Sequence, residues 1–449
     1  MKKLLLLGLF LIFPTFVFAD DITNTSNIFL DDEKINSKIT DDKENTYITI
    51  NKDNIIKIQN TESIYGLYII YELNSVQGTI QNSIKNNIIG ENNFLHEYIN
   101  VDEKIGNSNE ITLTYNENVK IAEIYVLDNN KLPDFVEVWN NPLNEADLLL
   151  LSTHSDDEQL FFLGLLPTYV AKGAKVQVAY FVNHNDNPKR LHEQLHGLYT
   201  VGIRNYPIIG EIPDAYSESL NGAIKNIEKA NITIDDAVNF QVEVLRRFKP
   251  LVVVGHDELG EYSHGQHILN THTLKIALEK TNDKTYHTSS FEKYGLWDVP
   301  KTYLHLYKEN KIIMDYDTPL EYFDGLTAYE VSKKGYSCHL SQQWTWFTKW
   351  INGTNNSYTK STDIKKYSPN EFGLYRTTVG LDNKKNDMFE NLEFRKESIK
   401  EENNTINDVV ETINENKDNI INDLLNYKEY IIIGIGAFLG LIYIIKRKR

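Results

Sequence analysis

The sequence predicts an α/β protein, in which a parallel sheet with helices on both faces follows a small all-β sandwich and precedes a C-terminal transmembrane helix. Three observations lead to this fold class. In the central part of the chain, short apolar runs alternate with helical patterns, which is typical of βαβ units. Short β-branched runs punctuated by Asn, Gly and Asp precede them. A last apolar run ends directly before Lys446–Arg449.

The composition limits the class of protein. At 449 residues the chain is too long for one ordinary domain. A formal net charge of −17 argues against nucleic acid as a partner. The single cysteine, Cys338, excludes an intrachain disulfide, and we expect it to be a buried apolar residue rather than a nucleophile.

The N-terminal stretch has the pattern of a secretory signal. Lys2 and Lys3 precede an apolar run over 4–18, and the small residue Ala19 marks the expected cleavage site. Residues 20–45 are polar and poor in large apolar side chains, which predicts a flexible lead-in.

Residues 46–143 are predicted to form the β-sandwich. Its expected strands are Tyr47–Ile50, Leu67–Leu73, Ile111–Tyr115, Ile121–Leu127 and Phe135–Val138. The last of these strands resemble galactose-binding-like jelly rolls, which often bind carbohydrate. A structural spacer without a ligand explains the same pattern.

Residues 144–393 are predicted to form the α/β domain, with a parallel Rossmann-like sheet. Its expected strands are Leu148–Leu151, Val176–Val182, Tyr206–Ile209, Leu251–Val254 and Tyr303–Leu306. Its expected helices are Arg190–Val201, Asp235–Phe248 and Ile268–Glu279. Residues 311–393 form an aromatic-rich extension, whose Gln342–Phe347 segment serves either packing or sugar stacking.

A polar cluster, His154–Glu158, directly follows the first of these strands, and Leu160, Phe161, Leu163 and Leu166 then recur at helical spacing. The carboxyl end of a strand is where open α/β sheets bind ligands. Helix capping alone would also account for acidic residues in this turn.

A second polar cluster follows the strand Leu251–Val254 and contains His256, His264 and His267. His264 and His267 are three residues apart at the start of a predicted helix, so both rings can point to one side. A histidine pair alone is weak evidence. Two strand ends that each carry histidine and carboxylate can, however, supply the mixed nitrogen and oxygen ligands of an open zinc site.

Three segments together resemble the LmbE/PIG-L family of zinc-dependent N-acetylglucosamine de-N-acetylases. His154–Glu158 resembles the family's His-Pro-Asp-Asp-Glu signature, with Ser155 in place of proline. Arg190–Glu193 matches its Arg-x-x-Glu, and Gly260–His267 resembles its Gly-Glu-Tyr-Gly-His-x-x-His segment. The resemblance covers about residues 146–310, and the Ser155 departure changes turn rigidity rather than a ligand.

The resemblance implies that His154, Asp157 and His267 hold Zn²⁺. It also implies catalytic roles for the residues around them. Asp156 would be the general base, a cationic His264 would stabilise the oxyanion or protonate the amine, and Tyr262 would donate to the oxyanion. Arg190 would orient the substrate, while Glu158 and Glu193 would hold the ligand loop.

The C-terminal part predicts a tethered protein. Residues 394–428 form a charged, Asn-rich stalk, 429–446 a transmembrane helix and 447–449 a cytoplasmic tail, which leaves the catalytic domain outside the cell. The apolar run is short for a full span, and a buried core helix is the alternative. Gly436 and Gly440 form a GxxxG pattern, a weak signal for a homodimer through this helix.

Two functions are compatible with the sequence. The first is a cell-membrane hydrolase that removes N-acetyl groups from N-acetylglucosamine units of a surface glycan or glycolipid. The alternative is a catalytically inactive carbohydrate-binding surface protein. We favour the enzyme because every residue that the chemistry needs is present.

Overall fold

The computed structural model describes residues 21–396, apart from 93, 130 and 345. The chain divides into two compact units, Met1–Phe394 and Arg395–Arg449, and the second lies almost wholly outside the described residues. The predicted signal peptide, transmembrane helix and cytoplasmic tail, and nearly all of the predicted stalk, also lie outside them. Among the helices of residues 21–396, none is long and apolar enough to cross a membrane.

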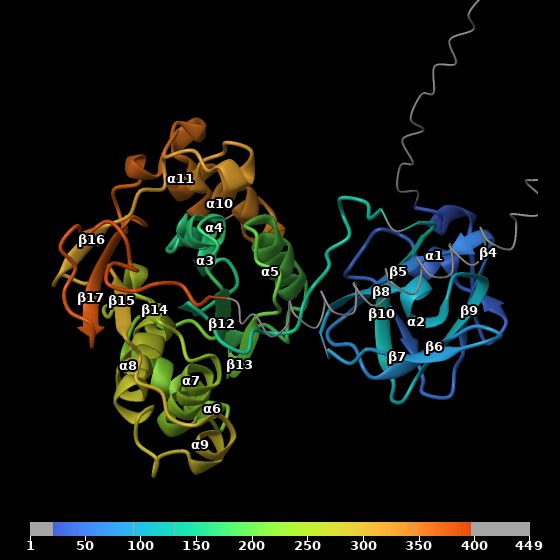
Figure 1. The fold of residues 1–449 in the computed structure, drawn as a ribbon, viewed down its shortest axis with the longest axis horizontal. Coiled ribbons are helices and arrows are strands. Elements are labelled where there is room, and N and C mark those ends of the chain that lie inside the picture. The colour runs from blue at the N-terminus through green and yellow to red at the C-terminus, as the bar shows by residue number, and fades with distance from the viewer. Residues whose placement is uncertain (1–20, 93, 130, 345, 397–449) are drawn as a thin grey trace, which may run out of the picture. The chain divides into compact units, whose positions relative to one another are not determined.

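The first part of the chain forms two antiparallel sheets (Figure 1). In sheet order, the six-stranded sheet contains β2 (Glu33–Lys34), β1 (Asn27–Leu30), β4 (Ile56–Ile64), β9 (Ser108–Tyr115), β6 (Gly78–Gln81) and β7 (Asn86–Ile89). The four-stranded sheet contains β3 (Ile48–Ile50), β10 (Val119–Leu127), β5 (Gly66–Tyr71) and β8 (His96–Asn100). Side chains of both sheets, such as Ile58 and Leu67, share one buried core. The short helices α1 (Asn36–Ile39) and α2 (Val101–Ile105) connect strands of this part.

The prediction of a flexible lead-in over 20–45 is wrong for the described residues. Strand β1 pairs with β4 over its whole length, and Asn27 is opposite Gln59. The segment has few large apolar residues, but Ile22, Ile28, Ile35 and Ile39 are all buried. The average composition of the segment therefore did not reveal that these four isoleucines pack into the core.

The predicted strand Phe135–Val138 is also absent from the described structure. Pro133 starts a turn there, in which the Val136 amide donates to the Pro133 carbonyl at 3.0 Å. Strands β4, β6, β7 and β8 were not predicted, because their Asn-, Gln- and Glu-rich sequences lack an apolar run.

The second part of the chain is built on one seven-stranded sheet. Its order is β13 (Ile208–Pro213), β12 (Val176–Asn183), β11 (Leu148–Ser152), β14 (Val252–Gly255), β15 (Lys301–His305), β17 (Glu371–Thr377) and β16 (Lys311–Ile313). The first five strands are parallel, as predicted. Strands β17 and β16 add antiparallel from the extension, where no strand was predicted.

Helices cover both faces of this sheet, as predicted (Figure 1). Leu148 and Leu150 of β11 pack into one core, and Leu149 and Leu151 into the other. The first core includes α4 (Leu165–Ala171), α5 (Lys189–Thr200) and α10 (Ala328–Ser337). The second includes α7 (Ile234–Phe248) and α8 (Gly265–Lys280). Further helices of this part are α6 (Leu220–Lys229), α9 (Thr288–Tyr294) and α11 (Phe347–Asn352).

The helix expected after the first polar cluster is interrupted. A short α3 (Asp157–Leu160) ends before Gly164, and α4 begins at Leu165. Gly164 has φ +83°, and a Cβ there would lie 2.3 Å from the Tyr316 ring. The helical spacing of the apolar residues thus reflects core packing on two short helices instead of one continuous helix.

Candidate metal centre

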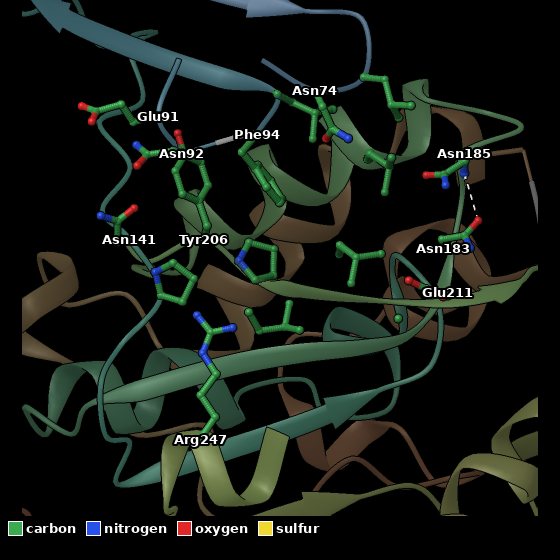
Figure 2. A pocket seen from close by; sticks show the side chains of 18 of the residues that line it. Asn74, Glu91, Asn92, Phe94, Asn141, Asn183, Asn185, Tyr206, Glu211 and Arg247 are labelled. Atoms are coloured by element: carbon green, nitrogen blue, oxygen red, sulfur yellow. Dashed lines mark hydrogen bonds between the residues drawn. The ribbon is translucent and has the colours of Figure 1, made fainter. Parts of the chain in front are cut away.

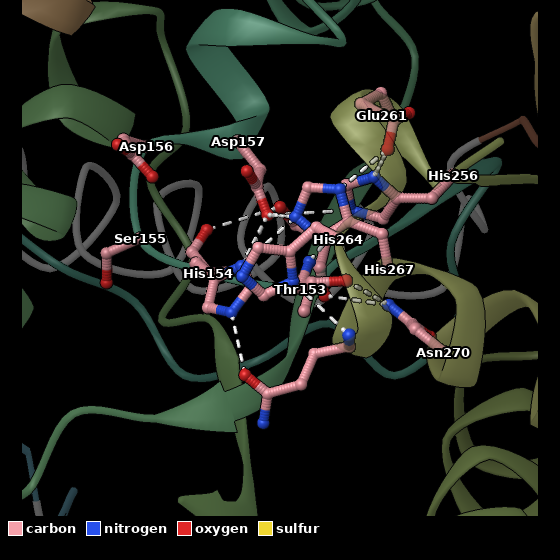
Figure 3. A network of polar contacts seen from close by, with 12 residues as sticks. Thr153, His154, Ser155, Asp156, Asp157, His256, Glu261, His264, His267 and Asn270 are labelled. Carbon is pink, nitrogen blue, oxygen red and sulfur yellow. Dashed lines mark hydrogen bonds and ion pairs between the residues drawn. The ribbon is translucent and has the colours of Figure 1, made fainter. Parts of the chain in front are cut away.

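Three ligand-type atoms converge at the carboxyl ends of β11 and β14. His154 Nδ1 lies 3.1 Å from Asp157 Oδ2 and 3.2 Å from His267 Nε2, and these last two atoms are 3.2 Å apart. Figure 3 shows the histidine rings gathered around the Asp157 carboxylate, with Asp156 to one side. We call the group of His154, Asp157 and His267 the metal centre. It brings together the three predicted ligands.

Hydrogen bonds on the outer nitrogens fix which atom of each ring faces inward. His154 Nε2 donates to Gln266 Oε1 at 3.0 Å, and that oxygen also accepts the Ala215 amide at 3.1 Å. His267 Nδ1 donates to Glu261 Oε2 at 2.7 Å. His154 Nδ1 and His267 Nε2 therefore face Asp157, and ring nitrogens held in this way by partners on the opposite side are typical of metal-binding histidines.

Glu261 anchors the second strand end. Its carboxylate is fully buried and faces the Nδ1 atoms of three histidines, His267, His256 at 2.8 Å and His305 at 2.7 Å. Burial raises the pKa of Glu261, but the nearby His256 and His267 outweigh it and hold this pKa well below its usual range. An ionised carboxylate of this kind orients several rings at once.

Asp157 is buried and ionised. Burial raises its pKa, but His267 and His154 outweigh this effect and hold the pKa of Asp157 well below the usual value. Its Oδ2 also accepts the His154 amide at 2.7 Å, which closes the loop between β11 and α3. The loop therefore presents a negative oxygen to any cation held between the two histidines.

Asp156 does not point into the metal centre. Its backbone has φ +117°, and its amide donates to Glu158 Oε2 at 3.0 Å. Its Oδ1 lies 3.4 Å from Arg190 Nη2. Burial raises the pKa of Asp156 to about 7, while Arg190 opposes the rise. A carboxylate with this pKa next to a ligand is suited to accept a proton near neutral pH.

Arg190 reaches the site, but its guanidinium is engaged by the protein. Nη1 donates to Asp214 Oδ2 at 3.0 Å, and Nη2 donates to the Ser155 carbonyl at 2.6 Å. These contacts hold the loop that carries Asp156. The predicted contact with substrate stays a prediction.

The expectation of a cationic His264 is wrong for the chain as described. Burial lowers the pKa of His264 to about 2, and His154 and His267 lower it further. Its Nδ1 accepts a hydrogen bond from the backbone N–H of Gln266 at 3.2 Å, and this bond caps the N-terminus of α8. Its Nε2 therefore carries the proton of a neutral ring, which can donate a hydrogen bond.

Tyr262 lies beside the metal centre, with its ring centroid 5.6 Å from that of His267. Burial raises the pKa of Tyr262, so its hydroxyl stays protonated. On its other side it meets Trp346 edge-on at 5.8 Å and Phe347 at 5.5 Å. Trp346 is 52% exposed, so this group of aromatic rings packs beside the metal centre and is also partly accessible to solvent.

Glu158 and Glu193 have different partners. Glu158 holds the ligand loop through the Asp156 amide, as predicted, and its other oxygen faces His339 Nε2 at 3.0 Å. Glu193 instead accepts the Ser341 amide at 2.7 Å, so the expectation that it holds the ligand loop is wrong. Its helix turns it toward the extension, which sequence spacing did not show.

Sequence reasoning missed four residues that support the centre: Glu261, Gln266, His305 and His184. Glu261 and Gln266 lie inside the second motif, so only their roles were missing. His184 Nε2 accepts the Ser155 amide at 3.1 Å, and His305 meets Glu261 from β15. His305 is the last residue of β15 and His184 directly follows β12, and no local pattern marks either of them.

A cavity of about 910 Å³ opens elsewhere, where residues of the β part meet edge strand β13 (Figure 2). Its lining includes Asn74, Asn92, Phe94, Asn183 and Asn185. None of the predicted site residues is among its described lining residues. The cavity is therefore distinct from the metal centre, although Asn183 and Asn185 flank His184 in sequence.

The fold and site define a class: an α/β protein with a mixed histidine and carboxylate centre at the carboxyl ends of parallel strands. No protein-family model matches the chain. Over 178 residues it is 31% identical to 1D-myo-inositol 2-acetamido-2-deoxy-α-D-glucopyranoside deacetylase 2 of Saccharopolyspora erythraea, covering 34% of this chain and 63% of that protein. Over 179 residues it is 28% identical to the corresponding deacetylase of Geodermatophilus obscurus, covering 35% and 60%. The chain thus spans less than two thirds of the length of either relative.

Among solved structures, the chain is similar to N,N′-diacetylchitobiose deacetylase from Pyrococcus horikoshii, with TM-score 0.38, 14% identity and coverage of 52% of this chain and 86% of that one. It is also similar to the zinc-inhibited form of teicoplanin deacetylase, with TM-score 0.31, 15% identity and coverage of 47% and 88%.

Proposed function

We propose that this chain is a metal-dependent N-deacetylase that acts on N-acetylglucosamine units of a glycan or glycolipid. The observation that carries the proposal is the triangle of His154 Nδ1, Asp157 Oδ2 and His267 Nε2, whose edges are 3.1–3.2 Å. Support comes from two curated relatives, whose names describe deacetylases of an acetamido sugar.

The triangle fits a zinc ion. Ligand atoms about 2.0–2.2 Å from Zn²⁺ in tetrahedral geometry are roughly 3.3–3.6 Å apart, a few tenths of an ångström more than the observed edges. The donors are two imidazole nitrogens and one carboxylate, and three protein ligands leave a position open for chemistry. When bound, zinc supplies a nucleophilic hydroxide near neutral pH and polarises the amide carbonyl.

The surrounding residues have the remaining roles. Asp156, with its pKa near 7, takes the proton of the attacking water and returns it to the departing amine. The neutral His264 and the protonated Tyr262 are hydrogen-bond donors for the charge that develops on the amide oxygen. Arg190 holds the Asp156 loop through the Ser155 carbonyl, so it acts on the base as a positioning residue.

The cell-surface location belongs to the same proposal and rests on the sequence: the signal pattern over 1–19, the apolar run over 429–446 and the cationic end. A protein tethered in this way would meet glycans or lipid-linked sugars outside the cell, with its catalytic part extracytoplasmic.

The decisive test is acetate release by the purified, zinc-loaded full chain. The panel contains an inositol-linked N-acetylglucosamine, β-1,4-linked N-acetylglucosamine oligomers and an N-acetylglucosaminyl lipid, with Asp156→Asn as the inactive control. We expect acetate and a free amine in equal amounts from at least one class. If saturable sugar binding occurs without acetate from any of them, the chain is a carbohydrate-binding protein and the proposal fails.

A further inference from the structure

A second group of histidines lies outside the metal centre, where strand β8 meets helix α5. His192 and His196 are four residues apart on α5, so both project from one side of the helix. His96 of β8 lies between them, with its ring centroid 5.1 Å from each of theirs. His96 and His192 are fully buried.

A nitrogen of His96, a nitrogen of His192 and an oxygen of Glu44 face a common point, and His196 joins them through Glu44. His96 Nε2 lies 2.8 Å from His192 Nδ1 and 4.0 Å from Glu44 Oε1. His196 Nε2 lies 2.7 Å from the same Glu44 oxygen. Ligand atoms of Glu44, His96 and His192 all lie within 4.8 Å of one another. The group therefore offers three imidazoles and one carboxylate.

The opposite nitrogen of each ring has a partner of its own. His196 Nδ1 donates to Glu137 Oε1 at 2.7 Å, and Trp139 Nε1 holds the other Glu137 oxygen at 3.0 Å. His192 Nε2 donates to the Glu72 carbonyl at 3.2 Å. His96 Nδ1 faces the Tyr68 hydroxyl at 2.9 Å. Carboxylate, carbonyl and hydroxyl partners of this kind orient metal-binding histidines.

We propose that His96, His192, His196 and Glu44 bind a second divalent metal ion of the zinc class. Four protein ligands leave no open position on the ion, which is typical of a structural ion. His192–His196 reads His-Glu-x-x-His, a spacing found on zinc-binding helices in which the glutamate serves as base. Here Glu193 accepts the Ser341 amide instead, which leaves no base and supports a structural role.

The ion would replace the direct His96–His192 and His196–Glu44 contacts. Their 2.7–2.8 Å separations are shorter than the roughly 3.3 Å between zinc ligands, so these side chains move apart by about half an ångström on binding. Glu44 and His96 belong to the β part, and His192 and His196 to the α/β part. The ion would therefore cross-link the two parts and stabilise the folded chain.

The proposal is tested by measuring how many zinc ions each full chain retains after it has been loaded with zinc and the unbound zinc has been removed. We expect two equivalents in the wild type, one in His267→Asn, one in His192→Asn and none in the double variant. His272→Gln, a partly exposed histidine on α8, is the matched control and should keep two. Because these ligands are separate from the metal centre, His192→Asn should still release acetate. The number of bound zinc ions tests the second site even if the chain proves not to be a deacetylase.

A second measurement covers the case in which His192→Asn does not fold. Glu44→Gln removes the ligand at the partly exposed rim of the cluster. Adding zinc to chelated His267→Asn should raise its unfolding temperature, and adding it to His267→Asn with Glu44→Gln should raise it less. A wild type with one equivalent that His267→Asn abolishes would overturn the second site, as would equal zinc stabilisation of the two variants.

Discussion

Two consecutive carboxylates at the metal centre point in different directions, and we predict that they have different roles. Asp157 faces both metal-centre histidines, whereas Asp156 turns to Arg190 through a backbone with φ +117°. Asp156→Asn keeps the shape and removes the proton acceptor, so we predict retained zinc and a loss on the order of 10²-fold or more in kcat. Asp157→Asn should lose zinc affinity, with activity partly restored by excess zinc. Metal content and kcat, measured on both variants, check the division.

The opposite pattern would refute this division. If Asp156→Asn loses its zinc, or turns over near the wild-type rate, Asp156 is a ligand or a bystander. The pKa near 7 would then reflect burial without a catalytic purpose.

Glu261 gives a second prediction at this scale. Glu261→Gln replaces one acceptor oxygen by an amide donor, which cannot satisfy the Nδ1–H groups of His256, His267 and His305 together. We expect zinc affinity to fall about 10–100-fold, the usual effect of losing such a partner. Competition with a chelator measures it. Glu258 forms an ion pair with Lys275 at the surface, so Glu258→Gln is the control and should bind zinc normally.

Individual site residues were predictable where the chemistry is local. The three predicted ligands lie in short motifs at strand ends, and the structure brings their side chains together. The neutral state of His264 could not be predicted, because it follows from burial beside two other histidines. His305 and His184 could not be found either, since one lies at the end of β15 and the other directly after β12, away from both motifs.

At the scale of elements, Arg246 on α7 caps the C-terminal end of α8 and the turn that follows it. It is fully buried, and its guanidinium donates to the carbonyls of Thr281 at 3.1 Å, Tyr286 at 2.9 Å and Asp283 at 2.7 Å. Cations are favoured at helix C-termini, where carbonyls lack partners. Because α8 carries His267, this cap holds the helix that presents a predicted ligand.

We predict that Arg246→Met destabilises the fold by about 2–4 kcal/mol, since several buried carbonyls lose their partner. Urea unfolding measures the change. Arg247→Met alters the neighbouring, less buried arginine and should change stability by less than about 1 kcal/mol. Equal effects of both substitutions would show that α8 does not depend on this cap.

Strands and helices with a strong apolar pattern were predicted well. The runs at β11, β12 and β14 are buried on both faces, which makes their signal continuous. Strands β6 and β7 were missed because tertiary pairing, rather than propensity, holds their polar residues extended. The break at Gly164 was missed because it depends on the ring of Tyr316, far along the chain.

At the scale of the whole molecule, we predict that the α/β part lies outside the cell. Protease added to intact cells should release a fragment that ends within residues 395–428, and the released fragment should keep its acetate-releasing activity. Immunoblotting of medium and cells checks this. Cleavage that requires lysis would contradict the topology.

The order of the two folded parts was predictable, but the start of the first was not. Residues 21–45 join the six-stranded sheet through isolated buried isoleucines, which a composition average cannot detect. The contacts between β8 and α5 could not be predicted either, because they join histidines about a hundred residues apart.

The central claim is that one zinc ion is bound by His154, Asp157 and His267. Anomalous diffraction at the zinc edge from zinc-loaded crystals tests it most directly. We predict a peak about 2.0–2.2 Å from His154 Nδ1, Asp157 Oδ2 and His267 Nε2, with the Asp156 carboxylate outside bonding distance. The absence of a peak between these three atoms, or a peak bonded to Asp156 in place of Asp157, would contradict the account.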